Sequence, residues 1–257
     1  MENISLSQQG KQSLQAEPQM QENGKEFNHQ EENIPSLEEL NRELKEQLKK
    51  EEPERKRLKM QADCGIFKRL VISSIGARYL KNFDDKLIRE KEELDKRIDE
   101  MFATGKGIIL FGDVGVGKTM DLVYISLRIF ENLIGAEIKV KDLLANSEGD
   151  IFYEGLHIPV SYYFMPTLFN KLHFAESVNF KKFVLLDDWG REYAEPFALS
   201  RFEILIEEIY ARENSLVITT NLTKEQFINR DGWARVTDRA REICSVLEIP
   251  GESMRHK

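Results

Sequence analysis

Residues 112–119 carry the pattern most typical of a phosphate-binding loop, G-x-x-x-x-G-K-[ST]. They are Gly112, Asp113, Val114, Gly115, Val116, Gly117, Lys118 and Thr119. Glycines let the backbone aim successive N–H groups at a β-phosphate, Lys118 can reach the β- and γ-phosphate oxygens, and the Thr119 hydroxyl can bind Mg²⁺. A glycine loop without a ligand is the alternative, and the rarity of a chance match disfavours it. The pattern therefore predicts ATP and Mg²⁺ as cofactors.

Two carboxylates follow an apolar run further along the chain. Residues 183–186 are typical of a buried strand, and Asp187 and Asp188 come directly after them. Because ligands of open α/β sheets bind at the carboxyl ends of the strands, Asp187 would lie beside the magnesium ion. Asp188 would then orient or deprotonate the attacking water. Alone, two acidic residues could simply cap a strand, but together with the upstream loop they predict a hydrolytic site.

A third apolar run, residues 216–218, leads into two threonines and Asn221. In a parallel sheet this asparagine would emerge beside the γ-phosphate, where it could hold the water. The alternative is a helix N-cap, since Leu-Thr-Lys-Glu follows. We favour the role at the site because the strand order would place it there.

The elements that must position these residues alternate between short apolar runs and amphipathic stretches, which predicts an α/β fold. We expect a three-layer P-loop NTPase fold with a parallel sheet and helices on both faces. The predicted strands are residues 107–111, 160–164, 183–186, 216–218 and 245–249. The predicted helices run from Lys118 to a stop at Gly135, over a shorter stretch after Pro166, and from about 200 to 212. Residues 136–157 read as an extra loop with a turn of helix at 142–145.

The composition is that of a soluble globular protein. The chain has 257 residues with 37 Lys+Arg against 45 Asp+Glu, a net charge of −8, which argues against a generic charge-driven coat on nucleic acid. No run is long and apolar enough for a membrane helix and no secretory signal is recognisable, so we expect a cytoplasmic protein without membrane contact. Only Cys64 and Cys244 are present, and the four histidines are scattered, so neither a disulfide framework nor a histidine metal site is expected.

The N-terminal region differs from the rest. Residues 1–34 are rich in Glu and Gln with one aromatic, so we expect a disordered acidic arm. Residues 35–65 are predicted to form an amphipathic helix and a linker, with a capping box at Ser36 and Glu39 and the helix ending near Pro53. The apolar side of this helix is formed by Leu37, Leu40, Leu44 and Leu48. A solvated helical arm is favoured over a partner-docking helix, because a coiled-coil seam needs at least about three heptads. Residues 66–257 are predicted to be the folded domain.

Several motifs together resemble the AAA+ ATPases, and among them the DnaC/IstB-like helicase loaders and transposition helper ATPases. Besides the phosphate loop they are Asp-Asp-Trp-Gly at 187–190, Thr-Thr-Asn-Leu at 219–222, the lead-in 75–83, Arg-Val-Thr-Asp-Arg at 235–239 and Gly-Glu-Ser-Met-Arg at 251–255. The resemblance covers about residues 66–257. The lead-in lines the adenine pocket in this family.

The resemblance implies a role for two arginines. Arg239 would act as an arginine finger in the site of a neighbouring subunit, which implies a homo-oligomer. From the sequence alone, Arg235, Arg239 and Arg241 could equally form a solvated helix face. Arg255 would be a second sensor of the γ-phosphate, but the chain after Asn221 is too short for a full helical lid, so we expect the lid to be reduced or absent.

The resemblance implies an ATP-hydrolysing helicase loader in DNA replication, with a replicative helicase as its partner. Single-stranded DNA would bind around Thr167–Lys171 and His173, although a plain packing helix fits this segment as well. Two alternatives stay open: a transposition helper whose partner is a transposase, and a nucleotide-switched binding module with little turnover. A small-molecule kinase is disfavoured because no Arg-rich lid is recognisable.

Overall fold

The computed structural model describes residues 36–140, 143 and 159–254. The chain divides into two compact units, residues 1–50 and 51–257. The elements in chain order are α1 (Leu37–Ser74), α2 (Ala77–Lys81), the 3₁₀ turn η1 (Asp85–Leu87), α3 (Lys91–Thr104), β1 (Gly107–Phe111), α4 (Lys118–Ile134), β2 (Val160–Phe164), α6 (Met165–His173), β3 (Phe183–Trp189), α7 (Pro196–Ala211), β4 (Ser215–Thr220), α8 (Lys224–Ile228), α9 (Ala234–Ile243) and β5 (Cys244–Glu248).

The five strands form one parallel sheet in the order β2-β3-β4-β1-β5. The strand that leads into the phosphate loop is therefore flanked by β4 and β5, and β3 lies next to β4. This order brings the carboxyl ends of β1, β3 and β4 to one edge of the sheet. The predicted α/β fold class is confirmed, and each of the five predicted apolar runs forms a strand.

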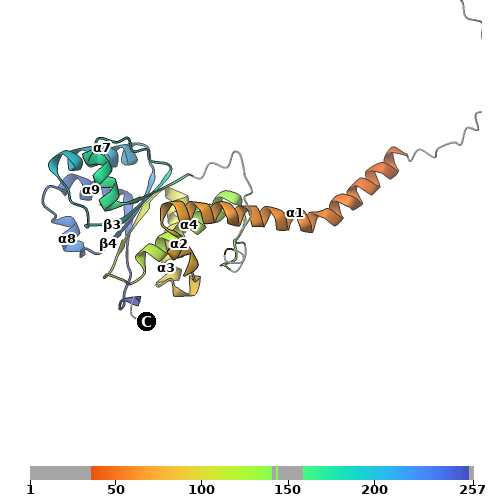
Figure 1. The fold of residues 1–257 in the computed structure, drawn as a ribbon, viewed down its shortest axis with the longest axis horizontal. Helices are drawn as coiled ribbons and strands as arrows, with labels where there is room; N and C mark the ends of the chain where they lie inside the picture. The colour runs from red at the N-terminus through yellow and green to blue at the C-terminus, as the bar shows by residue number, and fades with distance from the viewer. Residues whose placement is uncertain (1–35, 141–142, 144–158, 255–257) are drawn as a thin grey trace, which may run out of the picture. The chain divides into compact units, whose positions relative to one another are not determined.

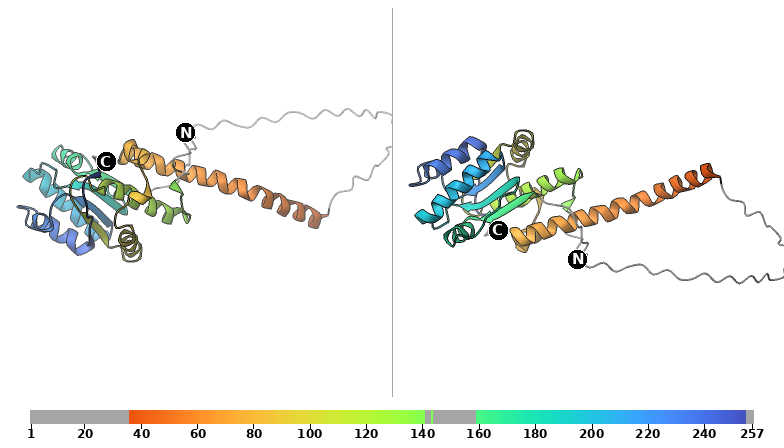
Figure 2. Two further views of the ribbon diagram at one scale, coloured as in Figure 1. Left: turned by 90° about the horizontal axis from the view of Figure 1, so that it is seen from below. Right: turned by 90° about the horizontal axis from the view of Figure 1, so that it is seen from above.

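Helices cover both faces of the sheet (Figures 1 and 2). Successive strand residues point to opposite faces, so Ile108 and Leu110 pack against α1 to α4 while Ile109 packs against α6 to α9. A strand buried on both faces has no polar side, which explains the uninterrupted apolar runs in the sequence.

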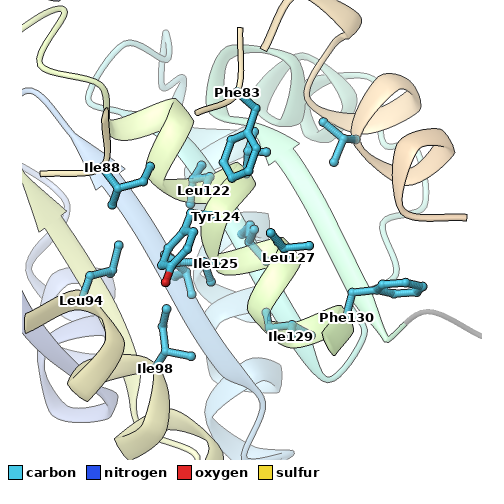
Figure 3. Close-up of a cluster of buried hydrophobic side chains, with 14 of the residues drawn as sticks. Phe83, Ile88, Leu94, Ile98, Leu122, Tyr124, Ile125, Leu127, Ile129 and Phe130 are labelled. Atoms are coloured by element: carbon cyan, nitrogen blue, oxygen red, sulfur yellow. The ribbon is translucent and has the colours of Figure 1, made fainter. Parts of the chain in front are cut away.

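Each face of the sheet thus has its own hydrophobic core. The helix that follows the phosphate loop, α4, lies in the larger one, together with α1 to α3. Figure 3 shows Leu94 and Ile98 of α3 beside Tyr124 of α4, and all three side chains are buried. The Tyr124 hydroxyl also donates a hydrogen bond of 2.7 Å to Asp95. These contacts hold α4 against α3.

The prediction that the first helix ends near Pro53 is wrong, because α1 continues through Pro53 to Ser74. A proline removes one backbone hydrogen bond and strains the preceding turn, but an exposed helix can leave the freed carbonyl to water. After Pro53, Cys64, Phe67 and Val71 recur at helical spacing and are fully buried, and this packing sustains the helix. The capping box at its start is confirmed, since Ser36 and Glu39 exchange hydrogen bonds of 2.9 and 3.2 Å.

Other predictions lie partly or wholly outside the described residues. They concern the disordered arm at 1–34, most of the extra loop at 136–157, and Arg255. Among the helices of the described ranges, none is long and apolar enough to cross a membrane. Within the described part of the chain, β4 is followed by α8, α9 and β5 and by no helical lid domain.

Candidate functional site

The phosphate loop connects the central strand β1 to α4, as its sequence predicts. Gly115 and Gly117 have φ of +88° and +114°, values that favour glycine, and Gly117 is the N-cap of α4 without a capping side chain. The first N–H groups of α4 therefore have no side-chain partner at the cap, and they lie at the positive end of the helix. This arrangement suits an anion.

Lys118 is buried, with 5% of its surface exposed, and its ammonium group donates hydrogen bonds to neighbouring groups of the protein. The Nζ atom donates to the carbonyls of Gly112 and Asp113 at 2.6 and 2.8 Å and to Oδ1 of Asn221 at 2.7 Å. Burial lowers the pKa of Lys118, while Asp188 and Asp187 act in the opposite direction. The contact with Asn221 joins the end of β4 to the phosphate loop, as the predicted strand order requires.

Asp187 is held by three hydroxyl groups. Its carboxylate accepts hydrogen bonds from Thr219 at 2.5 Å, from Tyr162 at 2.9 Å and from Thr119 at 3.2 Å. Burial raises the pKa of Asp187; the hydrogen bond from Thr219 opposes this, and the charge of Asp188 adds to it. The Thr119 hydroxyl and the Asp187 carboxylate are hard oxygen donors side by side, the set that Mg²⁺ prefers.

Asp188 occupies a strained position at the end of β3. Its φ is +60°, which is uncommon for a residue other than glycine, and surrounding contacts hold it there. Its N–H donates to the Thr219 hydroxyl at 3.0 Å, and its carboxylate accepts from Asn221 at 3.2 Å and from Arg191 at 2.8 Å. The Asp188 side chain therefore lies between the ends of β3 and β4, facing the same space as Lys118.

These groups line one cavity of about 1030 Å³. Beyond the motif residues it is lined by Ser74, Ile75, Arg78, Tyr79, Asn82, Met120, Tyr162, Phe164, Arg191 and Met254. The segment 75–83, identified by resemblance, thus contributes to the cavity that contains the phosphate loop. Tyr162 and Arg191 are not predicted by the sequence. Tyr162 stands in an apolar strand, and the one signal for Arg191 is its place three residues after Asp188.

Arg239 lies elsewhere in this chain. Its guanidinium pairs with Glu207 at 3.0 Å and Glu242 at 2.9 Å, stacks over Tyr210, and lines a cavity of about 240 Å³ formed by α7 and α9. The structure therefore brings together the phosphate loop, Asp187, Asp188 and Asn221, and it does not bring Arg239 to them within one chain.

The segment considered for single-stranded DNA forms α6. Leu168, Phe169 and Leu172 are buried against the sheet, as a packing helix requires. The lysine and the histidine of this helix lie near carboxylates: His173 Nδ1 is 2.8 Å from Glu195, and Lys171 Nζ is 3.8 Å from Glu176. These contacts leave little free positive charge on the helix.

Comparisons with known proteins add the following. No family model matches the chain, and no curated protein matches it. Among solved structures, similar ones include a DnaC helicase loader (18% identity, 68% of this chain and 99% of that chain, TM-score 0.47), DnaI (19%, 69% and 93%, 0.44) and a putative primosome component from Streptococcus pyogenes (18%, 64% and 82%, 0.43). Similarities of this size carry no information on function. The parallel sheet and the phosphate loop between its strand β1 and α4 give this chain an α/β fold of the P-loop type.

Proposed function

We propose that this protein is an ATP-binding and ATP-hydrolysing AAA+ protein that acts in DNA replication as a DnaC-like helicase loader. One observation supports the ATPase part above all others. A connected set of contacts runs from Lys118 through Asn221 to Asp188, and a second joins Thr119 to Asp187, all within one cavity. Three strand ends far apart in the sequence meet at the phosphate loop.

The binding roles follow from the chemistry of each group. The phosphate-loop backbone and Lys118 bind the β- and γ-phosphates of ATP, since both present donors to anionic oxygens. Thr119 and Asp187 would hold Mg²⁺, which supplies positive charge to the phosphates when bound. The residues that line the cavity at 75–82 would accept the nucleoside.

The hydrolytic roles fall to the ends of β3 and β4. Asp188 accepts a proton from, or orients, the attacking water, and Asn221 holds that water through its amide. Because Asn221 contacts both Lys118 and Asp188, it is placed to sense whether a γ-phosphate lies between them. Arg239 would complete the site of the next subunit in a homo-oligomer.

The loader role is supported by the motifs that resemble the DnaC/IstB-like family over residues 66–257. A replicative helicase is then the expected partner, and single-stranded DNA a further ligand.

Equilibrium binding and phosphate release test the ATPase role. Lys118→Ala should weaken ATP binding by on the order of a hundredfold or more, because it removes a charged donor to the phosphates. Lys224→Ala is the matched control, since Lys224 is an exposed lysine paired with Glu248. Asp188→Asn should bind ATP with little change and lose hydrolysis. Unchanged ATP hydrolysis by the Lys118→Ala protein would refute the proposed ATPase role.

Co-purification tests the partner. The Asp188→Asn protein should remain in its ATP-bound assembly, so it should be tagged, held with ATP and Mg²⁺ in extract from its own cells, and analysed by mass spectrometry. The Lys118→Ala protein is the control. Nucleotide-dependent recovery of the replicative helicase is the expected result, whereas recovery of a transposase would replace the loader by a transposition helper.

A further inference from the structure

The segment that follows β5 returns to the phosphate loop. The N–H of Ile249 donates to the carbonyl of Phe111 at 2.7 Å, at the end of β1. The N–H of Met254 then donates to the carbonyl of Gly115 at 2.9 Å, inside the loop itself. A Cβ added to Gly115 would collide with Ser253, and Met254 lines the cavity that contains the phosphate loop. Ser253 and Met254 are therefore in direct contact with the loop.

Arg89 holds this segment from the other side. Its two terminal nitrogens donate to the carbonyls of Pro250 at 2.7 Å and Glu252 at 2.8 Å, which are more than 160 positions away in the sequence. Gly251, between them, has a φ of +110°, and a Cβ there would collide with the guanidinium. The planar fork of arginine thus binds a stretch of backbone whose shape depends on glycine.

We propose that Arg89 is a positioning residue for phosphate binding, acting through the backbone of residues 250–254 on the Gly115 peptide. This inference rests on the proposed function of the loop. A peptide unit is planar and trans, so its carbonyl and its N–H point in opposite directions. The hydrogen bond from Met254 to the Gly115 carbonyl therefore fixes the direction of the Val116 N–H. That N–H points across the loop towards the Asp113 carbonyl, 3.5 Å away.

The ligand class follows from this geometry. The Gly115 peptide belongs to the loop that would hold the β-phosphate, which ATP and ADP share, so the binding of both nucleotides should depend on Arg89. Arg89→Ala should weaken the binding of both by about fivefold or more, the size expected for losing a well-placed hydrogen-bond donor. The affinity for ATP and the affinity for ADP should fall by a similar factor, because Arg89 would act on a loop that binds both nucleotides.

Two pairs of variants make the test specific. Arg89→Ala is compared with Arg212→Ala, which removes an exposed arginine paired with Glu208. Gly251→Ala is compared with Gly135→Ala, where φ is also positive at +65° but an added Cβ meets nothing within 4 Å. Arg89→Ala and Gly251→Ala should both weaken ATP and ADP binding, and the two controls should not.

Hydrogen–deuterium exchange separates positioning from loss of the fold. In both test variants, the peptide covering residues 112–120 should exchange faster, while peptides covering β3 and β4 should exchange as in the wild type. Wild-type nucleotide affinity in both test variants would overturn the inference, as would unchanged exchange at residues 112–120. If the wild-type protein itself binds neither ATP nor ADP, the proposed function fails, which is a different result from wild-type binding that is indifferent to Arg89.

Discussion

At the scale of the residue, one hydroxyl group links the two aspartates of the site. Thr219 donates to Asp187 and accepts from the N–H of Asp188, and its side chain is completely buried. The same threonine therefore sets the orientation of the expected magnesium ligand and fixes the strained backbone of the expected general base. A change at this position should affect chemistry more than binding, because the Thr219 hydroxyl bonds Asp187 and the N–H of Asp188, which lie at the end of β3, and not the loop that would hold the phosphates.

Thr219→Val tests this role with little change in volume. It leaves the Asp188 N–H without its partner and removes a donor from Asp187, so the free energy of unfolding should fall by about 1–3 kcal/mol. Hydrolysis should fall on the order of tenfold or more, because misplaced groups lose effective concentration, while ATP affinity changes little. Denaturant unfolding measures the change in stability, and steady-state turnover measures the change in hydrolysis.

The matched control is Thr220→Val. Thr220 is equally buried but donates to the Trp189 carbonyl at 2.7 Å instead of to a carboxylate. We expect a similar loss of stability with hydrolysis largely retained. Equal loss of turnover in the two variants would contradict a specific role for Thr219.

Tyr162 makes a second prediction at this scale. Its hydroxyl donates to Asp187 at 2.9 Å, and burial raises the pKa of Tyr162, with the Asp187 charge adding to the effect, so it stays a donor at neutral pH. Tyr162→Phe removes this donor and keeps the ring. The Asp187 carboxylate then loses one of its three orienting contacts, so the Mg²⁺ concentration for half-maximal turnover should rise by about twofold to tenfold.

Tyr163→Phe serves as its control, because the Tyr163 hydroxyl donates to the backbone carbonyl of Asn179 on an exposed surface. A magnesium dependence equal to the wild type in Tyr162→Phe would show that Thr219 and Thr119 hold Asp187 sufficiently on their own.

The sequence predicts the residues at the strand ends but not those that orient them. Lys118, Asp187 and Asn221 each follow from a local pattern, because the phosphate loop and an apolar run ending in a polar group are recognisable within ten residues. Tyr162 and Arg89 are different: their roles depend on the pairing of β2 with β3 and on contact with a distant segment. Their own neighbours in the sequence carry no sign of either contact.

At the scale of the element, the same distinction applies. The bounds of β1 and α4 agree with the prediction because glycine marks the end of α4 and the phosphate loop separates the two elements. By contrast, α3 is not predicted, and α9 is expected only under the alternative of a solvated helix face at Arg235, Arg239 and Arg241. Both are rich in charged residues, and the few apolar residues that α3 buries, Leu94, Ile98 and Met101, are easily overlooked among nine polar ones. Burial in the tertiary structure stabilises such helices more than their composition suggests.

Gly107 yields a prediction about the sheet. It begins β1, and an added Cβ would collide with the Leu216 carbonyl of β4 and lie 2.8 Å from the Cys244 sulfur of β5. Gly107→Ala should therefore force the central strands apart and lower the free energy of unfolding by about 3 kcal/mol or more. Gly65→Ala, in α1 where nothing lies within 4 Å of an added Cβ, should instead stabilise the protein by about 0.5–1 kcal/mol. Denaturant unfolding measures both, and equal stabilities would show that the sheet adapts to the extra methyl group.

At the scale of the whole molecule, the position of Arg239 matters most. It lies on α9 with its side chain 37% exposed and paired with Glu207 and Glu242. Exposed ion pairs of this kind contribute little to stability, so the guanidinium can exchange its carboxylate partners for a phosphate at low cost. Since it is not among the residues lining the cavity that contains the phosphate loop of its own chain, a catalytic role for Arg239 requires a second copy.

A mixing experiment tests that requirement. Arg239→Ala keeps the phosphate loop and lacks the finger, whereas Lys118→Ala keeps the finger and lacks nucleotide binding, so each should be nearly inactive alone. Mixed in equal amounts, they should recover roughly a quarter of the wild-type rate, because half of the subunits have an intact loop and half of their neighbours supply the arginine. Arg241→Ala, a change on the same helix at an exposed residue, should hydrolyse ATP alone and serves as the control. If the mixture shows no more than the sum of its two components, Arg239 does not act across a subunit interface, and its pairing with Glu207 and Glu242 is then its whole role.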